Sequence, residues 1–99
     1  MADQPTLTPE VVIAQGDDQV STVVDGETVL MNIGNGKYFQ LDDIGSRIWT
    51  LIETPMAVSA VCDQLVQEFD VDRAACETDV LALLARLLAN DLIRVALPA

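Results

Sequence analysis

Residues 28–49 read TVLMNIGNGKYFQLDDIGSRIW, and this stretch decides the fold. Two apolar-rich runs, Thr28–Ile33 and Lys37–Leu41, lie on either side of Gly34-Asn35-Gly36, whose glycines can supply the positive φ angles of a tight hairpin. At Asp42-Asp43 the spacing of apolar residues changes from two to three and four, as expected for a helix with an Asp N-cap. The stretch therefore predicts a strand, a turn, a second strand and a helix.

A third strand is predicted just before this stretch. Val20–Val24 is β-branched at every position except Ser21, and it ends at Asp25-Gly26, which is a strong hairpin signal. We therefore expect an antiparallel meander whose first and third strands are its edges. Its strands are Val20–Val24, Glu27–Ile33 and Lys37–Leu41. Two further short runs, Val11–Ala14 and Leu92–Val95, have the composition of strands.

Alternation assigns the side chains of the third strand to two faces. Lys37, Phe39 and Leu41 point one way, and we expect Phe39 and Leu41 to face the helices. Tyr38 and Gln40 point the other way, where they cover the outside of the sheet.

Three helices are predicted after the meander. The first runs from Asp42 to Glu53 and ends at Thr54-Pro55, because the residue before proline avoids the helical region. The second, Val58–Phe69, has apolar residues at i, i+3, i+4 and i+7. The third, Ala74–Ala89, follows Asp72 as its cap and is apolar on more than one side, which leaves a side for the sheet or a ligand. Strands followed by helices argue for an α+β fold: a three-stranded antiparallel sheet and a three-helix bundle.

Composition narrows the classes of function. The 99 residues are 51% apolar, enough for one domain with an aliphatic core, and we expect residues 1–10 to form a flexible tail before a single domain of residues 11–99. The net charge of −11 disfavours nucleic acid and anionic membranes, and it suits a basic partner or a neutral peptide. With no signal peptide and no membrane-spanning run, the cytoplasm is the expected location.

The residue types that carry catalysis or bind metals are scarce. The chain has no His, one Lys and no CxxC pair, so we expect no catalytic residue, no cofactor and no metal site. Cys62 and Cys76 fall in different predicted helices and are expected to be buried, reduced thiols, since a disulfide would need their Cα atoms within about 7 Å. Asp42 and Asp43 are better explained as a helix cap and solvated surface than as cation ligands.

Two other classes fit the sequence less well. A DNA-binding winged helix normally has a basic recognition face, whereas the third predicted helix carries Glu77 and Asp79 against Arg86. An acyl carrier protein would need a modifiable serine, but Ser46 lies between a glycine and an arginine, and the N-terminal meander does not belong in a four-helix carrier.

The strand Lys37–Leu41 is left with an unpaired edge, which is a template for pairing with another chain. An extended peptide could add to it by main-chain hydrogen bonds, with neighbouring pockets reading its side chains. The pocket would lie between this strand and the third helix, lined by Leu83 and Leu87 with Arg86 at its rim. The alternative is a helix packed on the sheet with no groove, and the pattern favours neither.

Several motifs resemble, in their order and spacing, the pyrroloquinoline quinone biosynthesis protein D (PqqD) family, which belongs to the RiPP recognition elements. The similarity covers about Val20 to Val95. The matching positions are Gly36, Lys37, Tyr38, Phe39, Leu41, Asp42, Gly45, Ile48, Trp49, Phe69-Asp70-Val71 and Asp79-Val80.

The resemblance implies a winged-helix-like domain that binds the leader of a ribosomally made precursor peptide and delivers it to a modifying enzyme. Such an enzyme would be a radical SAM protein or a lasso-peptide protease or cyclase. The leader is expected to add as a strand beside Lys37–Leu41, against the third helix. The implied peptide-binding residues are Lys37, Tyr38, Phe39, Gln40, Leu41, Asp79, Leu83, Arg86 and Leu87.

Two departures from the family pattern concern helix ends. Asp91 stands where the family usually has Gly, so that Asn90 or Asp91 must adopt the left-handed conformation. Ala57 stands where a Thr cap is usual, which makes Thr54-Pro55 an alternative start of the second helix. A rival function is a regulatory or subunit domain that binds a folded enzyme, and a homodimer with paired edges would fit either function.

Overall fold

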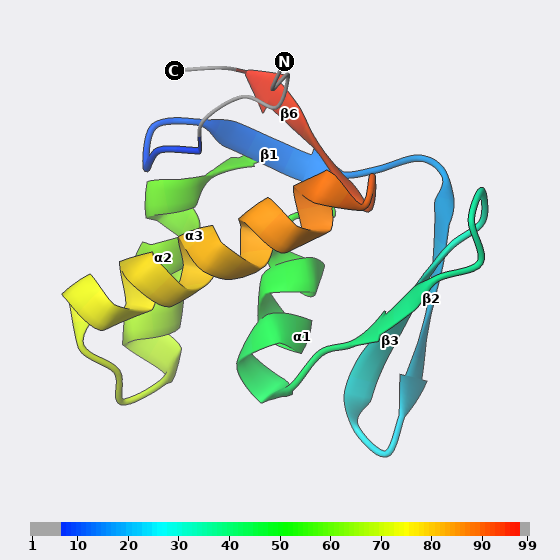
Figure 1. Ribbon diagram of the computed structural model, residues 1–99. Coiled ribbons are helices and arrows are strands. Elements are labelled where there is room, and N and C mark those ends of the chain that lie inside the picture. Colours follow the sequence, from blue (N-terminus) through cyan, green and yellow to red (C-terminus); the bar gives the residue numbers. More distant parts are fainter. Residues whose placement is uncertain (1–6, 98–99) are drawn as a thin grey trace.

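The computed structural model describes residues 7–97, and its strands form two separate three-stranded antiparallel sheets. The elements in chain order are β1 (Val12–Gln15), β2 (Gln19–Val24), β3 (Glu27–Asn32), β4 (Tyr38–Gln40), α1 (Asp43–Leu51), β5 (Met56–Ala57), α2 (Val58–Glu68), α3 (Arg73–Ala89) and β6 (Ile93–Leu97). The sheet orders are β2-β3-β4 and β5-β1-β6. β1 and β6 cross one end of the helices, and β2 and β3 stand beside them (Figure 1).

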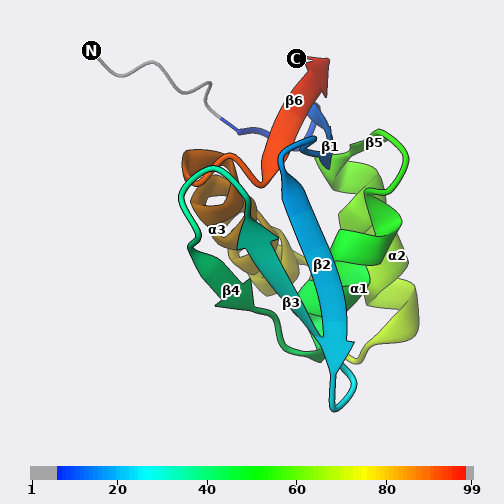
Figure 2. The same ribbon diagram turned by 90° about the vertical axis from the view of Figure 1, so that its right-hand side faces the viewer.

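The predicted meander of β2, β3 and β4 is confirmed, with β3 in the centre. Asp25 and Gly26 turn the first hairpin with φ of 53° and 83°. In the second turn Gly36 has a φ of 73°, as expected. Gly34 was also expected to have a positive φ, and it does not. The helices lie behind this sheet in Figure 2, so that its opposite face is bare.

Asn32 fixes the second turn to the end of α3. Its side chain is almost fully buried, and its Oδ1 accepts hydrogen bonds from the backbone N–H groups of Gly34 (2.7 Å) and Asn35 (3.2 Å). Its Nδ2 donates to the backbone oxygen of Asn90 at 2.7 Å. A buried amide with three partners in two segments holds the β3–β4 hairpin against the helix.

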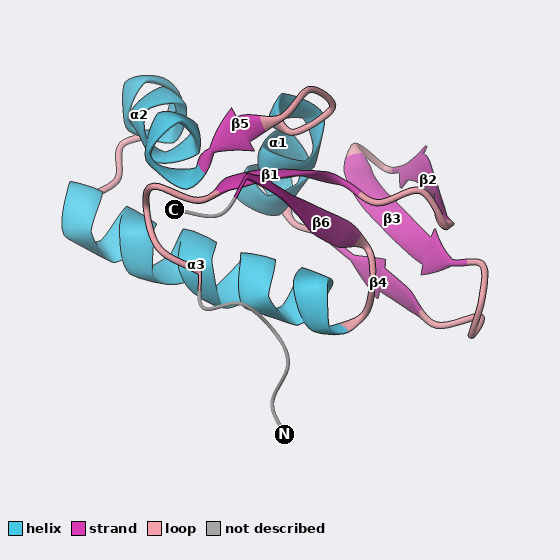
Figure 3. Ribbon diagram, turned by 90° about the horizontal axis from the view of Figure 1, so that it is seen from above, coloured by secondary structure: helices cyan, strands magenta, loops and turns pink. Residues whose placement is uncertain are grey.

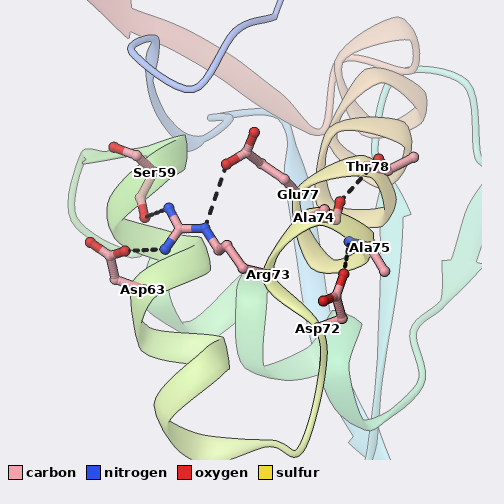
Figure 4. Close-up of polar contacts among 8 residues, drawn as sticks. All are labelled: Ser59, Asp63, Asp72, Arg73, Ala74, Ala75, Glu77 and Thr78. Atoms are coloured by element: carbon pink, nitrogen blue, oxygen red, sulfur yellow. Dashed lines mark hydrogen bonds and ion pairs between the residues drawn. The ribbon is translucent and has the colours of Figure 1, made fainter.

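Both predicted aspartate caps are present. The Asp42 carboxylate accepts from the Gly45 N–H at 2.8 Å, and Asp72 accepts from Ala75 at 3.0 Å (Figure 4). α1 ends at Leu51, two residues earlier than predicted, because the chain must turn toward β5.

The alternative start of α2 at Thr54-Pro55 is wrong. Residues 56–57 form β5, and Ala57 is the N-cap without a side-chain hydrogen bond. The first N–H groups of the helix are satisfied by another segment instead: Val58 donates to the Val11 oxygen (3.0 Å) and Ser59 to the Pro9 oxygen (2.9 Å). Backbone carbonyls of a distant segment thus replace the missing side-chain cap.

The second sheet joins segments from the whole chain. The short runs at 11–14 and 92–95 do form strands, β1 and β6, which pair with Ile13 opposite Val95. β5 was not predicted, and it interrupts the expected order of strands followed by helices. Of the predicted tail, residues 1–6 lie outside the described residues, and Pro9 lies against the start of α2 through its bond to Ser59.

The core is aliphatic, as the composition predicts, and is formed mainly by the buried faces of the helices and β1. Cys62 and Cys76 are both buried free thiols, as expected. Burial, with Cys76 close by, raises the pKa of the Cys62 thiol to about 11.

Two arginines form ion pairs between helices at the surface. Arg73 of α3 bonds to Asp63 of α2 and lies 3.5 Å from Glu77 one turn along (Figure 4). Arg47 of α1 makes a bidentate pair with Glu68 of α2, at 2.7 and 2.8 Å. These contacts connect α1 to α2 and α2 to α3.

Candidate functional site

β4 keeps one free edge. Within residues 7–97 it pairs only with β3. Two backbone bonds frame this pairing: the Leu41 N–H donates to the Thr28 oxygen and the Asn32 N–H donates to the Lys37 oxygen, both at 2.8 Å.

The register decides which backbone groups of β4 are free. In an antiparallel pair the residues that bond to the neighbour alternate with residues that do not. Lys37 and Leu41 bond to β3, and Phe39, halfway between them, belongs to the same set. Tyr38 and Gln40 therefore direct their N–H and C=O groups to the open edge, which makes two donors and two acceptors.

The side chains of β4 and of Leu41, which follows it, lie as the alternation predicted. Leu41 is buried and Phe39 is half-buried on the helix side, whereas Tyr38 is 71% exposed on the outer face. Gln40 is also exposed and donates to Glu27 of β3 at 2.8 Å.

A groove runs between β4, α1 and α3. Figure 3 shows β4 beside the C-terminal half of α3. The groove has a volume of about 380 Å³, within the range of ligand pockets. It is lined by Phe39, Gln40, Leu41, Asp42, Ile44, Gly45, Ile48, Asp79, Leu83, Arg86 and Leu87. The helix is thus not packed flat on the strand, and the space lies directly beneath the free edge.

Most of the predicted site residues meet in this groove. Phe39, Gln40 and Leu41 form one wall and the four predicted residues of α3 the other. Lys37 and Tyr38 do not line it: both are exposed, Lys37 before the strand and Tyr38 on the outer face.

Sequence reasoning missed the contribution of α1. Ile44 and Ile48 line the groove, although their spacing indicated only a packed helix. Gly45 is the signal that could have revealed it. A Cβ at Gly45 would lie 3.1 Å from Leu41 Cβ and 3.5 Å from Leu83 Cδ2, so a glycine lets α1 approach both walls.

The rim of the groove carries charge of both signs. Asp42 and Asp79 are exposed at the end where α1 begins, and Arg86 lies two turns further along α3. Among the described residues, none of these three side chains is in an ion pair. An apolar floor with charged ends suits an extended peptide better than a small polar substrate.

No group of three or more His, Cys, Asp or Glu side chains within residues 7–97 could hold a metal ion. None of the helices described here combines the length and apolar character that crossing a membrane requires.

Known proteins are similar to the chain over most of its length. Residues 27–93 match the family coenzyme PQQ synthesis protein D (PqqD), a region that includes both walls of the groove. No curated protein sequence matches. The solved structure of TbiB1 in complex with the TbiA(beta) leader peptide is 36% identical, with a TM-score of 0.75, and the match covers 82% of this chain and 94% of that one. A lasso peptide synthetase B1 complexed with the leader peptide is 24% identical (TM-score 0.74; 83% and 96% covered) and is similar in fold.

Proposed function

The chain belongs to the PqqD family, and from this premise we propose that it is a non-catalytic protein that binds the leader segment of a ribosomally made precursor peptide. The leader adds as a strand to the free edge of β4 and lies over the groove against α3.

The observation that carries this proposal is the set of free backbone groups at Tyr38 and Gln40 directly above an apolar groove. An added strand would satisfy the two donors and two acceptors at once. Since side chains of a strand alternate, every second residue of the leader would enter the groove. Phe39, Leu41, Leu83 and Leu87 would contact these residues.

The identity of the ligand as a leader peptide rests on TbiB1, which is 36% identical and was solved with a leader peptide. Lys37 and Arg86 would then pair with acidic side chains of the leader at one end of the groove, and Asp79 with a basic one at the other. We further propose that the bound precursor is delivered to a modifying enzyme, a radical SAM protein or a lasso-peptide protease or cyclase. Buried free thiols at Cys62 and Cys76 suit the reducing cytoplasm for this step.

The test is a calorimetric titration with the leader of the short precursor peptide that is encoded nearest to the gene of this chain. Tyr38→Pro removes a backbone N–H donor that points to the open edge, and it removes no hydrogen bond to β3. We therefore expect the fold to be retained and the leader to bind at least tenfold more weakly. Unchanged affinity would refute strand addition at β4.

The groove wall is tested with a matched pair of charges on α3. Leu83→Asp places a carboxylate in the apolar groove, and we expect it to weaken leader binding at least tenfold. Ala82→Asp adds the same charge at an exposed neighbouring position that does not line the groove, and binding should stay within about twofold. If both variants bind alike, the groove is not the leader site.

A further inference from the structure

The exposed apolar side chains of this protein gather on the β2-β3-β4 sheet. Of the seven large hydrophobic residues exposed in the described chain, six lie in this sheet or its second turn. These are Val20, Val23, Val24, Met31, Ile33 and Tyr38; the seventh is Val66. The bare face of the sheet, turned to the viewer in Figure 2, carries Val20, Val24, Met31 and Tyr38. Concentration on one uncovered face indicates a contact surface.

The same sheet has a second free edge, at β2. Within residues 7–97, β2 pairs only with β3. The Ile33 N–H donates to the Asp18 oxygen at 3.0 Å, so the residues that bond to β3 follow Asp18 in steps of two. Gln19, Ser21 and Val23 are in the other set, and their N–H and C=O groups point away from the sheet.

The β2 edge, which we define as residues 19–24 bracketed by Asp17 and Asp25, lacks the usual protection. It has no charged residue, no Pro and no bulge along its six residues, although natural proteins normally guard an edge with one of these devices. Its only charges are the carboxylates at its two ends. An unprotected edge of this length is suited to pairing with another strand.

Charge disfavours a second copy of the chain as the occupant. Antiparallel pairing centred on Ser21 would place Gln19 opposite Val23 of the other copy and Asp17 opposite its Asp25, at both ends of the pair. Like charges directly opposite destabilise a strand pair, and each chain carries a net charge of −11.

We propose that the β2 edge docks a folded partner protein that adds its own free strand edge, uncharged in the middle and basic at both ends. Asp17 precedes the six-residue strand and Asp25 directly follows it, so the basic side chains of the partner should flank a pairing segment of about 20 Å. The leader on β4 and the partner on β2 would occupy opposite edges of one sheet and bind together. Only the identity of this partner, as the enzyme that modifies the leader, rests on the proposed function.

The probe is a cyclised β-hairpin peptide with the outer strand Lys-Thr-Val-Thr-Val-Thr-Val-Thr-Lys, compared with the same hairpin carrying Glu at both ends. By fluorescence anisotropy on the full chain, we expect the Lys hairpin to bind at least tenfold more tightly. The double variant Asp17→Asn, Asp25→Asn should abolish the preference, and Asn tolerates the φ of 53° at position 25. Equal binding of the two hairpins to the unmodified chain overturns the proposal.

Ser21 gives a matched pair of variants. Ser21→Pro removes an outward N–H and no bond to β3, so the Lys hairpin should bind at least tenfold more weakly; Ser21→Thr keeps the donor and should bind within twofold. Leader binding at β4 should survive Ser21→Pro. Loss of both ligands would mean that the variant only damages the fold, and this result would count against the proposal.

A dimer in sedimentation equilibrium that Ser21→Pro dissociates would also overturn the proposal. Hairpin binding without leader binding would leave this inference standing and refute the proposed function.

Discussion

Asp91 ends α3 in the left-handed conformation, with a φ of 58°. The sequence left Asn90 and Asp91 as alternatives for this position, and the structure assigns it to Asp91, with the Leu92 N–H closing the helix on the Leu87 oxygen at 3.0 Å. A left-handed conformation costs an L-residue about 1 kcal/mol, although Asp and Asn bear it better than most residues.

The first prediction concerns this residue. Asp91→Gly relieves the left-handed strain, and we expect the free energy of unfolding to rise by about 0.5 kcal/mol, part of the relief being lost to the more flexible unfolded chain. Urea denaturation followed by circular dichroism measures the change. Asp70→Gly is the matched control, because Asp70 has a negative φ and the glycine should destabilise there. A less stable Asp91→Gly chain would show that the Asp side chain is needed at this position.

Among the elements, α1 is connected to α2 by the ion pair between Arg47 and Glu68, both about one-third exposed. Hydrogen bonds from Arg47 and then from Gln64 lower the pKa of Glu68 from 4.5 to about 2. The pKa in the folded state is below that of the unfolded chain. The contribution of the pair to stability is therefore complete above about pH 4.5 and is lost as the pH falls toward 2.

The second prediction is a titration of the Glu68 carboxyl group by NMR. We expect its midpoint near pH 2 in the native chain and clearly higher in Arg47→Gln, which removes the bidentate donor and leaves the hydrogen bond from Gln64. Gln64→Ala should raise the midpoint by less, because the hydrogen bond from Gln64 lowers the pKa of Glu68 by less than the one from Arg47. An ordinary midpoint in the native chain would mean that the pair does not persist in solution.

Elements with local signals could be predicted from the sequence, and those with distant partners could not. Asp25-Gly26 specifies a hairpin, and Asp42 and Asp72 cap helices, within four residues of chain. β5 has two residues, too few for any alternation, and its partner Val12 is 45 positions from Ala57. Nothing near residue 57 indicates that pairing, which is why the sequence offered Thr54-Pro55 as a helix start.

The same distinction applies to the groove. Its walls on β4 and α3 were predicted because an edge strand and a helix apolar on several sides both leave surface to cover. The floor that α1 contributes was not predicted, because Ile44 and Ile48 have the spacing of any packed helix. Only the tertiary structure places Gly45 beneath Leu41.

The whole molecule is strongly acidic, with sixteen Asp and Glu residues and a net charge of −11. Among the described residues only Asp63, Glu68 and Glu77 have an arginine partner. The remaining carboxylates repel one another, and folding brings them closer together than they are in the unfolded chain. Self-repulsion is therefore a general cost to the folded state.

The last prediction follows from screening of this repulsion. Raising NaCl from 0.02 to 0.5 M shortens the Debye length from roughly 20 Å to roughly 4 Å, so the folded chain should gain about 1 kcal/mol and its melting temperature should rise by about 4–8 °C. Thermal unfolding followed by circular dichroism measures this shift. A variant with Asp17→Asn, Asp18→Asn and Asp70→Asn, three carboxylates that make no hydrogen bond in the described structure, should melt higher in low salt and respond less to NaCl. A melting temperature that falls with salt would show that attraction between charges outweighs repulsion, and that the three surface ion pairs matter more than the net charge.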